Sequence, residues 1–331
     1  MSSNFSPFSL LRGIASAAFA AAGSIVGQAV AAPVRGRVVL ITGSSSGLGL
    51  ALAERYATAG AKLVLTARSM DDLTAAKERL LHRGAIREAD ILLLPCDIAK
   101  ADDVSSMIHA AIAHFGRVDV LINNAGIIQV GPIESQTVEA FQQAMQTNFF
   151  GAVHTVQAVL PHMLARRTGK IVNIASIAGK FAMPHLLPYV ASKFALVGYS
   201  EGLHAELRHK GIRVTTVCPG LMRTGSQNHA QFSGNARAES RWFTIAATMP
   251  LLAASVKRAA NRIYMAEHDG RAEITITPQA WLAARFAGAH PEASQIAAAI
   301  VNEYLLPNAP YAIAAPSAPA PATPHATASP A

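Results

Sequence analysis

The stretch Val38-Val-Leu-Ile-Thr-Gly-Ser-Ser-Ser-Gly-Leu-Gly49 indicates the architecture of the chain. It opens with a short apolar run, which is typical of a strand buried on both faces. A glycine-rich turn follows, and then a run of helix formers over residues 50–60. Glycines let the backbone approach a pyrophosphate, and a helix N-terminus offers free N–H groups. The stretch therefore predicts a dinucleotide site, although Gly43 and Gly47 are separated by three residues instead of the usual one.

The same alternation of strand and helix patterns continues along the chain. Apolar runs predict further strands at residues 62–66, 91–94, 118–122, 170–175, 212–217 and 272–277. Helical patterns separate them at residues 69–82, 102–115, 137–166 and 189–211. Such alternation predicts an α/β fold, a Rossmann-type doubly wound parallel sheet of about seven strands with helices on both faces. We expect one domain over residues 35–306.

The two ends of the chain differ in composition from this domain. Residues 14–32 carry no charged side chain, which fits a cleaved signal peptide, a membrane-associated or spanning helix, or a helix packed on its own domain or a disordered leader. A spanning helix would place Arg35 and Arg37 on the cytoplasmic side. Residues 307–331 are rich in Ala and Pro and are expected to be a disordered tail.

The overall composition excludes several classes of function. The 331 residues include 28 Lys+Arg and 20 Asp+Glu, a formal charge of +8. Because no basic run with interleaved aromatics is present, we expect no nucleic-acid partner but a diffuse positive field that suits a polyphosphate cofactor. The twelve His show no metal-ligand spacing, so no metal is predicted. Cys96 and Cys218 end apolar runs and indicate a reducing, cytoplasmic compartment.

A chemically suggestive pair lies in Tyr189-Val-Ala-Ser-Lys193, at the start of a helical pattern. Residues four apart share a helix face, so the Lys193 ammonium is expected near the Tyr189 phenol. A nearby cation lowers the pKa of a phenol and makes it a usable general acid or base. The alternative is a pair on a solvated helix face.

Two positions after the second and third strands bear on the cofactor. A dinucleotide site commonly has an acidic residue at the end of the second strand, but here Ala67 is followed by Arg68. A guanidinium can bind a 2′-phosphate, which favours NADP(H) over NAD(H) unless Arg68 is a solvated loop residue. Asp97 ends the third strand and either accepts a hydrogen bond from the adenine amino group or caps its own loop.

Six motifs in one order make the chain resemble the short-chain dehydrogenase/reductase (SDR) family over about residues 35–224. They are TGSSSGLG at 42–49, NNAG at 123–126, Asn148, Ser176, YVASK at 189–193, and Pro219-Gly220 with Thr224. Asn148 interrupts a predicted helix, where Asn is a mediocre residue, and therefore indicates a kink with a function.

The resemblance implies a catalytic set of four residues. Tyr189 would pass a proton to or from the substrate oxygen while a hydride moves between substrate carbon and nicotinamide. Lys193 would lower the pKa of Tyr189 and bind the nicotinamide ribose. Ser176 would orient the substrate oxygen, and Asn148 would hold a water that connects Lys193 to solvent.

The resemblance also implies the cofactor contacts. The phosphates would lie against the glycine turn, the adenosine ribose against the NNAG motif, and the nicotinamide against the loop after the sixth strand. The residues concerned are Gly43, Ser45, Ser46, Gly47, Leu48, Gly49, Asn124, Ala125, Gly126, Pro219, Gly220 and Thr224.

Apolar residues mark the expected substrate region. In this family a flap covers the substrate, here at about residues 225–250, which contain Phe232, Trp242, Phe243 and Met249. Together with the apolar loop 177–188, they indicate a bulky apolar carbonyl compound or alcohol, such as a lipid-derived ketone, a steroid-like ring or a 3-oxoacyl chain. Residues 279–306 are apolar and helical, which fits a lid, a membrane-facing surface, a dimer contact or ordinary core packing.

Three functions are consistent with these features. The first is an NADP(H)-dependent reductase or dehydrogenase, expected to be a homo-oligomer like many relatives. The second is a cofactor-binding sensor or membrane scaffold without turnover, which has no need of an activated phenol. The third is a lipid-surface protein that depends on residues 1–34.

Overall fold

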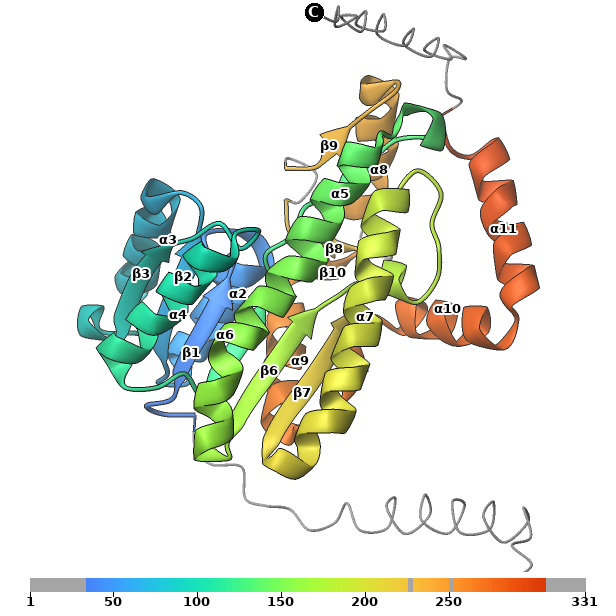
Figure 1. Ribbon diagram of the computed structural model, residues 1–331. Helices are drawn as coiled ribbons and strands as arrows, with labels where there is room; N and C mark the ends of the chain where they lie inside the picture. Colours follow the sequence, from blue (N-terminus) through green and yellow to red (C-terminus); the bar gives the residue numbers. More distant parts are fainter. Residues whose placement is uncertain (1–33, 226–228, 250–252, 308–331) are drawn as a thin grey trace, which may run out of the picture.

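Seven parallel strands form one central sheet (Figure 1). The computed structural model describes residues 34–225, 229–249 and 253–307. The strands are β1 (Val38–Thr42), β2 (Lys62–Ala67), β3 (Ile91–Pro95), β4 (Val120–Asn123), β6 (Gly169–Ile174), β7 (Ile212–Cys218) and β11 (Glu273–Thr275). Their order is β11-β7-β6-β4-β1-β2-β3, and every neighbouring pair is parallel. The predicted Rossmann-type sheet is confirmed.

Helices cover both faces of this sheet. One face packs against α2 (Gly47–Thr58), α3 (Met70–His82) and α9 (Val256–Asp269). The other packs against α4 (Ala101–Phe115), α6 (Gly151–Arg166) and α7 (Leu187–Leu207). Figure 1 shows α4, α6 and α7 in front of the sheet and α9 behind it. Because side chains alternate along a strand, Val39 and Ile41 of β1 face one helical layer and Leu40 faces the other.

Shorter elements complete the described chain. They are the helices α5 (Val138–Met145), α8 (Ala236–Thr248), α10 (Pro278–Ala289) and α11 (Pro291–Tyr304), the 3-10 turns η2 (Glu88–Asp90), η3 (Ile133–Ser135), η5 (Ile177–Gly179) and η6 (Arg208–Lys210), and the paired strands β5 (Gln129–Val130) with β9 (Gln231–Phe232) and β8 (Met222–Arg223) with β10 (Ala254–Ser255).

A chain of buried polar side chains crosses the sheet. Thr155 of α6 donates to Asn123 of β4 at 2.6 Å, and Asn123 donates to Asn173 of β6 at 2.9 Å. Asn173 donates to Ser200 of α7 at 3.0 Å, and Thr216 of β7 donates to the same hydroxyl at 2.7 Å. Burying polar groups costs free energy unless they are paired, so these bonds favour one register of the strands over any slipped one.

A second buried polar cluster surrounds Glu267 of α9. Its carboxylate lies 2.7 Å from Lys170 Nζ and 3.4 Å from Arg37 Nη1, and it accepts a hydrogen bond from the Tyr56 hydroxyl at 3.0 Å. Burial is the main influence on Lys170 and lowers its pKa, which the Glu267 charge opposes. The cluster joins the starts of β1 and β6 to α2 and α9, at the end of the strands opposite the glycine turn.

The helix predicted over residues 137–166 is not continuous. Between α5 and α6, η4 (Gln146–Phe150) is one turn of π-helix with Asn148 at its centre. A π-turn carries one extra residue and leaves carbonyls to be satisfied by other partners. The predicted interruption at Asn148 is therefore confirmed, and it takes the form of this wider turn.

The apolar C-terminal segment forms two helices, because Pro291 starts a second one. Figure 1 shows α11 standing beside the body at the end of α10. Ile296 is 63% exposed and Tyr304 is 72% exposed, and α11 buries none of its residues. Ordinary core packing of α11 is therefore excluded.

Two of the sequence predictions fall largely on residues outside the described ranges. The leader at residues 1–34 is described only at Val34, and the tail at 307–331 only at residue 307. Among the helices within the described ranges, none combines the length and the apolar character that a membrane span needs.

Candidate active site

The carboxyl ends of the seven parallel strands lie at one edge of the sheet. There the strand order reverses between β1 and β4, since β2 lies on one side of β1 and β4 on the other. Open α/β sheets bind ligands in the crevice that forms at such a point. The glycine turn after β1 and the NNAG motif after β4 border this crevice.

Thr42 and Asn124 hold the two loops together. The Thr42 hydroxyl accepts from the backbone N–H groups of Asn124 and Ala125 at 2.9 and 3.0 Å. The Asn124 side chain donates to the carbonyls of Thr42 and Gly43 at 2.9 and 3.1 Å. Asn124 therefore shapes the glycine turn with its amide group.

Only glycine fits at two positions of the turn. Gly43 has a φ of 63°, and an added Cβ would lie 2.9 Å from the Ala125 Cα. An added Cβ at Gly49 would collide with the Gly43 carbonyl oxygen. These glycines therefore allow β1, the NNAG loop and the start of α2 to approach one another closely.

The N-terminus of α2 suits a bound pyrophosphate. Its N-cap, Ser46, is exposed and makes no side-chain capping bond, and the first turn contains no acidic residue. Within the described residues, Ser46 thus leaves the first N–H groups without a side-chain cap, and the dipole favours an anion. Gly47 and Ser45 are partly exposed beside them, whereas Leu48 and Gly49 are buried and contribute backbone. On this geometry the turn fits the phosphates of a dinucleotide.

Arg68 and Asp97 lie after β2 and β3. Arg68 is exposed, and no ion pair or hydrogen bond is seen for it within the described ranges. Ser44 of the glycine turn bonds to Thr66 at the end of β2, which brings Arg68 to the neighbourhood of the turn. Asp97 accepts from the Ala99 N–H at 3.1 Å, so it caps its own loop and retains further acceptor capacity for an adenine amino group.

Ser176 and Tyr189 meet beside the end of β6. Ser176 follows β6 and is buried, and its hydroxyl accepts from the Ala178 N–H at 3.1 Å. Burial is the largest influence on the Tyr189 phenol and raises its pKa, and the neighbouring Ser176 hydroxyl opposes this. The phenol is therefore protonated at neutral pH and is an acid before it is a base.

Lys193 does not act on Tyr189 in the way the sequence predicts. Its Nζ lies 5.6 Å from the centroid of the Tyr189 ring and donates to the Ile174 carbonyl at 2.9 Å. Because the ammonium is directed at this carbonyl and at the ring face, the expected lowering of the Tyr189 pKa by Lys193 is not seen. Burial lowers the pKa of Lys193 itself to about 8, and the nearby Cys218 thiol opposes this.

Asn148 is hydrogen-bonded to Ile127, the residue that follows the NNAG motif. Its Oδ1 accepts from the Ile127 N–H at 2.8 Å, and its Nδ2 donates to the Ile127 carbonyl at 3.0 Å and to Ser192 Oγ at 2.9 Å. An added Cβ at Gly126 would lie 2.8 Å from Asn148 Oδ1 and 3.7 Å from Lys193 Nζ. The structure therefore brings Asn148 and Lys193 to the same glycine, and the bridging water stays a prediction.

The loop after β7 closes the other side of the crevice. The Pro219 carbonyl accepts from the Ile177 N–H at 2.8 Å, which ties this loop to the residue after Ser176. An added Cβ at Gly220 would lie 2.9 Å from Thr277 Oγ1. Thr224 lies next to the glycine turn, since an added Cβ at Gly47 would be 3.5 Å from its carbonyl oxygen.

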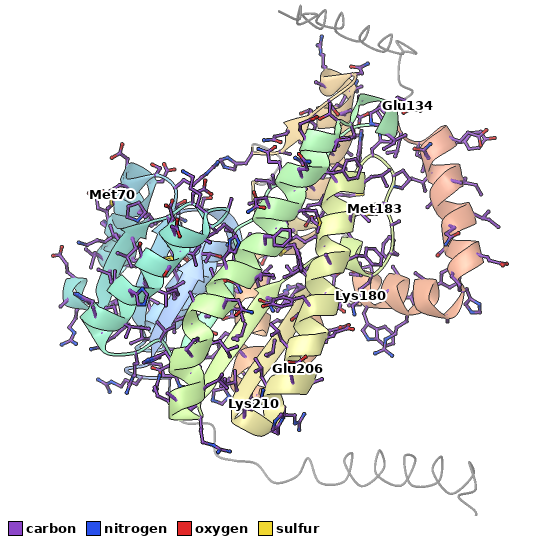
Figure 2. All side chains as sticks on the ribbon, in the orientation of Figure 1. Met70, Glu134, Lys180, Met183, Glu206 and Lys210 are labelled. Atoms are coloured by element: carbon purple, nitrogen blue, oxygen red, sulfur yellow. The ribbon has the colours of Figure 1, made fainter. Side chains whose placement is uncertain are left out.

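An apolar cluster lies against Tyr189. Its buried members come from β5, η5, the start of α7 and α8, and Met183, Trp242 and Phe232 are partly buried against it. Figure 2 places Met183 beside the upper half of α7, whereas Glu206 marks the lower end of that helix and Lys210 lies in the following turn η6. The predicted apolar substrate region and the phenol are therefore neighbours. A hollow of about 520 Å³ along α9 and β11 shares no residue with this region.

Comparison with known proteins identifies the family. The sequence model of the short chain dehydrogenase family matches residues 37–232. The chain belongs to this family.

Other comparisons place the chain among SDR proteins of differing chemistry. The fatty acyl-CoA reductase of Acinetobacter baylyi is 41% identical over 194 residues, which are 58% of this chain and 64% of that protein. An SDR structure from Burkholderia phymatum with NAD has a TM-score of 0.72 at 28% identity and covers 79% of this chain and 96% of its own. An actinorhodin polyketide ketoreductase with NADPH has a TM-score of 0.64 at 28% identity, with coverages of 73% and 95%.

The match to curated relatives is partial. The aligned region spans 56–61% of the length of four SDR proteins that are 38–39% identical to this chain. The two SDR structures just described contain NAD and NADPH, so the family comparison supports a nicotinamide cofactor.

Several contributors to the site are not among the residues predicted from sequence. Thr42 organises the turn, and Ser192 links Asn148 to the Tyr189 carbonyl, to which it donates at 2.7 Å. Thr42 ends a strand directly before the first glycine, a position that could have revealed it. Ser192 lies within the YVASK motif, but its bond to Asn148 joins residues 44 apart, which no local pattern indicates.

Proposed function

We propose that this SDR protein is an NADP(H)-dependent oxidoreductase that converts a bulky apolar ketone into a secondary alcohol, or the reverse. The observation that carries the proposal is the neighbouring pair of Ser176 and Tyr189, with Lys193 against the Tyr189 ring, beside the apolar cluster of the flap. A sensor without turnover has no use for such a pair. The fatty acyl-CoA reductase among its relatives supports an apolar substrate.

Each residue of the site has a separate role in the proposed reaction. Ser176 and Tyr189 donate hydrogen bonds to the substrate oxygen, which stabilises the charge that develops there. Tyr189 then transfers its proton to that oxygen. The buried Lys193 ammonium raises the positive potential around the site and is positioned to bind a ribose hydroxyl. A bound nicotinamide supplies or accepts the hydride. The apolar residues of the flap exclude water, which strengthens each of these interactions.

A panel of ketones and secondary alcohols, each assayed with NADPH and NADH, tests the proposal. We expect turnover of bulky apolar ketones, with NADPH preferred. Absence of turnover with every ketone and alcohol, in protein that binds NADPH, would favour a sensor.

The pH dependence follows from the two shifted groups. Reduction needs a protonated Tyr189, whose pKa is raised, and a charged Lys193, whose pKa is about 8. We expect kcat/KM for reduction to be steady up to about pH 7 and to fall as the pH rises through about 8. Alcohol oxidation needs the phenolate and should gain from rising pH. Profiles measured in both directions check this, and a reduction rate that climbs between about pH 7 and 9 would contradict it.

The cofactor preference is tested at Arg68. Arg68→Ala removes the guanidinium that we place at the 2′-phosphate, and charge-assisted hydrogen bonds contribute about 1.5–3 kcal/mol. The Kd for NADPH should rise about ten- to a hundred-fold while that for NADH changes little. Fluorescence titration with both cofactors measures this. Arg83→Ala is the control, since Arg83 caps the end of α3 and pairs with Glu54 of α2. Equal weakening of both cofactors by Arg68→Ala would refute the preference.

We also propose that the protein is a homo-oligomer in which the exposed apolar faces of α10 and α11 contact another copy of the chain. The exposed side chains that support this are Trp281, Leu282, Phe286, Ile296, Ile300, Tyr304 and Leu305. We further propose that residues 35–306 form a single domain.

A further inference from the structure

A buried pair joins the loop before Tyr189 to helix α8. His185 is 7% exposed and Glu239 is 1% exposed. The His185 Nδ1 lies 2.9 Å from Glu239 Oε1 and 3.1 Å from Oε2. A carboxylate only accepts hydrogen bonds, so Nδ1 carries a proton and donates it to this contact. The bond links two segments that are 54 residues apart in the chain.

The Glu239 carboxylate is fixed from a second side. Trp242, one turn further along α8, donates its indole N–H to Glu239 Oε2 at 2.6 Å. Both oxygens of this buried carboxylate thus have partners. A buried carboxylate held in this way loses much of its stabilisation if either partner is removed.

The backbone of His185 is also constrained. Its φ is 61°, in the left-handed region that His, Asn and Asp adopt more readily than other non-glycine residues. Its carbonyl accepts from the Gly131 N–H at 2.7 Å. Unfavourable backbone conformations persist where the surroundings hold them, so this loop is built to present the imidazole to α8.

Among the residues that the structure describes, few buried side chains hold α8. Of its 13 residues only Glu239, Phe243 and Ala247 are buried. Phe243 packs in the apolar cluster that Tyr189 and Trp242 border. Segments with few buried apolar side chains open most easily. The position of α8, and of the apolar wall that it places beside the phenol, therefore depends heavily on one polar contact.

We propose that the His185–Glu239 pair is a latch that positions α8 over the substrate region, so that His185 and Glu239 are positioning residues that set the fit of bulky substrates. Breaking the latch lets α8 move away from Tyr189 without changing the glycine turn. The substrate part of this inference rests on the proposed function, whereas the movement of α8 does not.

Two substitutions at the same position separate the latch from general damage. In His185→Asn the side-chain Nδ2 takes the place of the imidazole Nδ1 and can donate to Glu239, and Asn tolerates the left-handed φ. His185→Asp tolerates the same φ but sets a carboxylate against a carboxylate. Arg241→Gln, exposed on the same helix, is the matched control.

Hydrogen exchange followed by mass spectrometry gives the first readout. In the protein without ligands, we expect amides of residues 231–249 to exchange at least about ten-fold faster in His185→Asp than in the wild type. His185→Asn and Arg241→Gln should match the wild type, and β1, β4 and β6 should be unchanged in all variants. Unchanged exchange at 231–249 in His185→Asp would refute the latch. Equal acceleration across the central sheet would show a brace of the whole fold, which also refutes it.

Kinetics with a bulky and a small ketone give the second readout. For His185→Asp we expect the KM of the bulky ketone to rise about ten-fold, with kcat and the Kd for NADPH nearly unchanged, and His185→Asn should restore the KM. Faster exchange with an unchanged KM would refute the positioning role. If the wild type reduces no ketone, the proposed function fails, and the exchange experiment still decides whether α8 is latched.

Discussion

Tyr189→Phe is expected to lower kcat for ketone reduction about a thousand-fold, because it removes the proton donor while keeping the ring. The Phe ring can still pack beside Lys193 and in the apolar cluster around α8. The Kd for NADPH should therefore stay within about two-fold of the wild type, since the cofactor turn is untouched. Steady-state kinetics and a fluorescence titration on the same preparation measure both quantities.

Tyr199→Phe is the matched control for this experiment. Tyr199 is on the same helix, and its buried hydroxyl has no hydrogen-bond partner within the described part of the chain. Removing that hydroxyl should leave kcat unchanged and stability equal or slightly higher, because an unsatisfied buried polar group is destabilising. If Tyr189→Phe retains a large fraction of wild-type kcat, the phenol is not the proton donor and the proposed chemistry is wrong.

Glu267→Ala is expected to destabilise the fold by about 3–5 kcal/mol, which is the usual range for removing one partner of a buried ion pair. Lys170 and Arg37 would be left without their anion in a largely buried position, and the Tyr56 hydroxyl would lose its acceptor. Chemical denaturation of both proteins at neutral pH measures the difference. Cofactor binding should be retained under native conditions, because the cluster lies at the far end of the strands.

Glu88→Ala is the control that tests whether burial of the ion pair, as opposed to its short distance, determines the loss of stability. Glu88 lies 2.6 Å from Lys77 Nζ, as close as any partner of Glu267, but its side chain is 72% exposed. Solvent screens such a pair, so its loss should change the free energy of unfolding far less than the loss of Glu267 does. Similar losses from Glu267→Ala and Glu88→Ala would show that the Glu267 cluster adds little to stability.

The sheet could be predicted from sequence because its signal is local. Strands of a parallel sheet are covered on both faces, so each is a continuous apolar run such as Val38–Thr42. The glycine turn and the Tyr189–Lys193 spacing are also local, since their partners are a few residues apart. The site residues could therefore be named, and their roles stay predictions that the mutations test.

The buried polar contacts and the shifted pKa values depend on residues far apart in the chain, which no short sequence pattern encodes. Glu267, Lys170 and Arg37 look like ordinary charged residues in the sequence, and they are brought together across 97 and 230 residues. The His185–Glu239 contact depends in the same way on the placement of α8. The sequence predicts a lowered pKa for Tyr189, whereas burial raises it. Burial and the direction of the Lys193 side chain are properties of the folded chain.

The wide turn at Gln146–Phe150 has a consequence for anyone who redesigns this protein. Deleting one residue there would restore a regular α-helical repeat, and the helix would then have a more regular backbone geometry. The same deletion would rotate Asn148 by about 100° relative to one of its flanking helices, away from Ile127 and Ser192. A redesign that makes the backbone regular would thus keep the fold. It would also move Asn148, which is predicted to serve the chemistry, out of its place in the site.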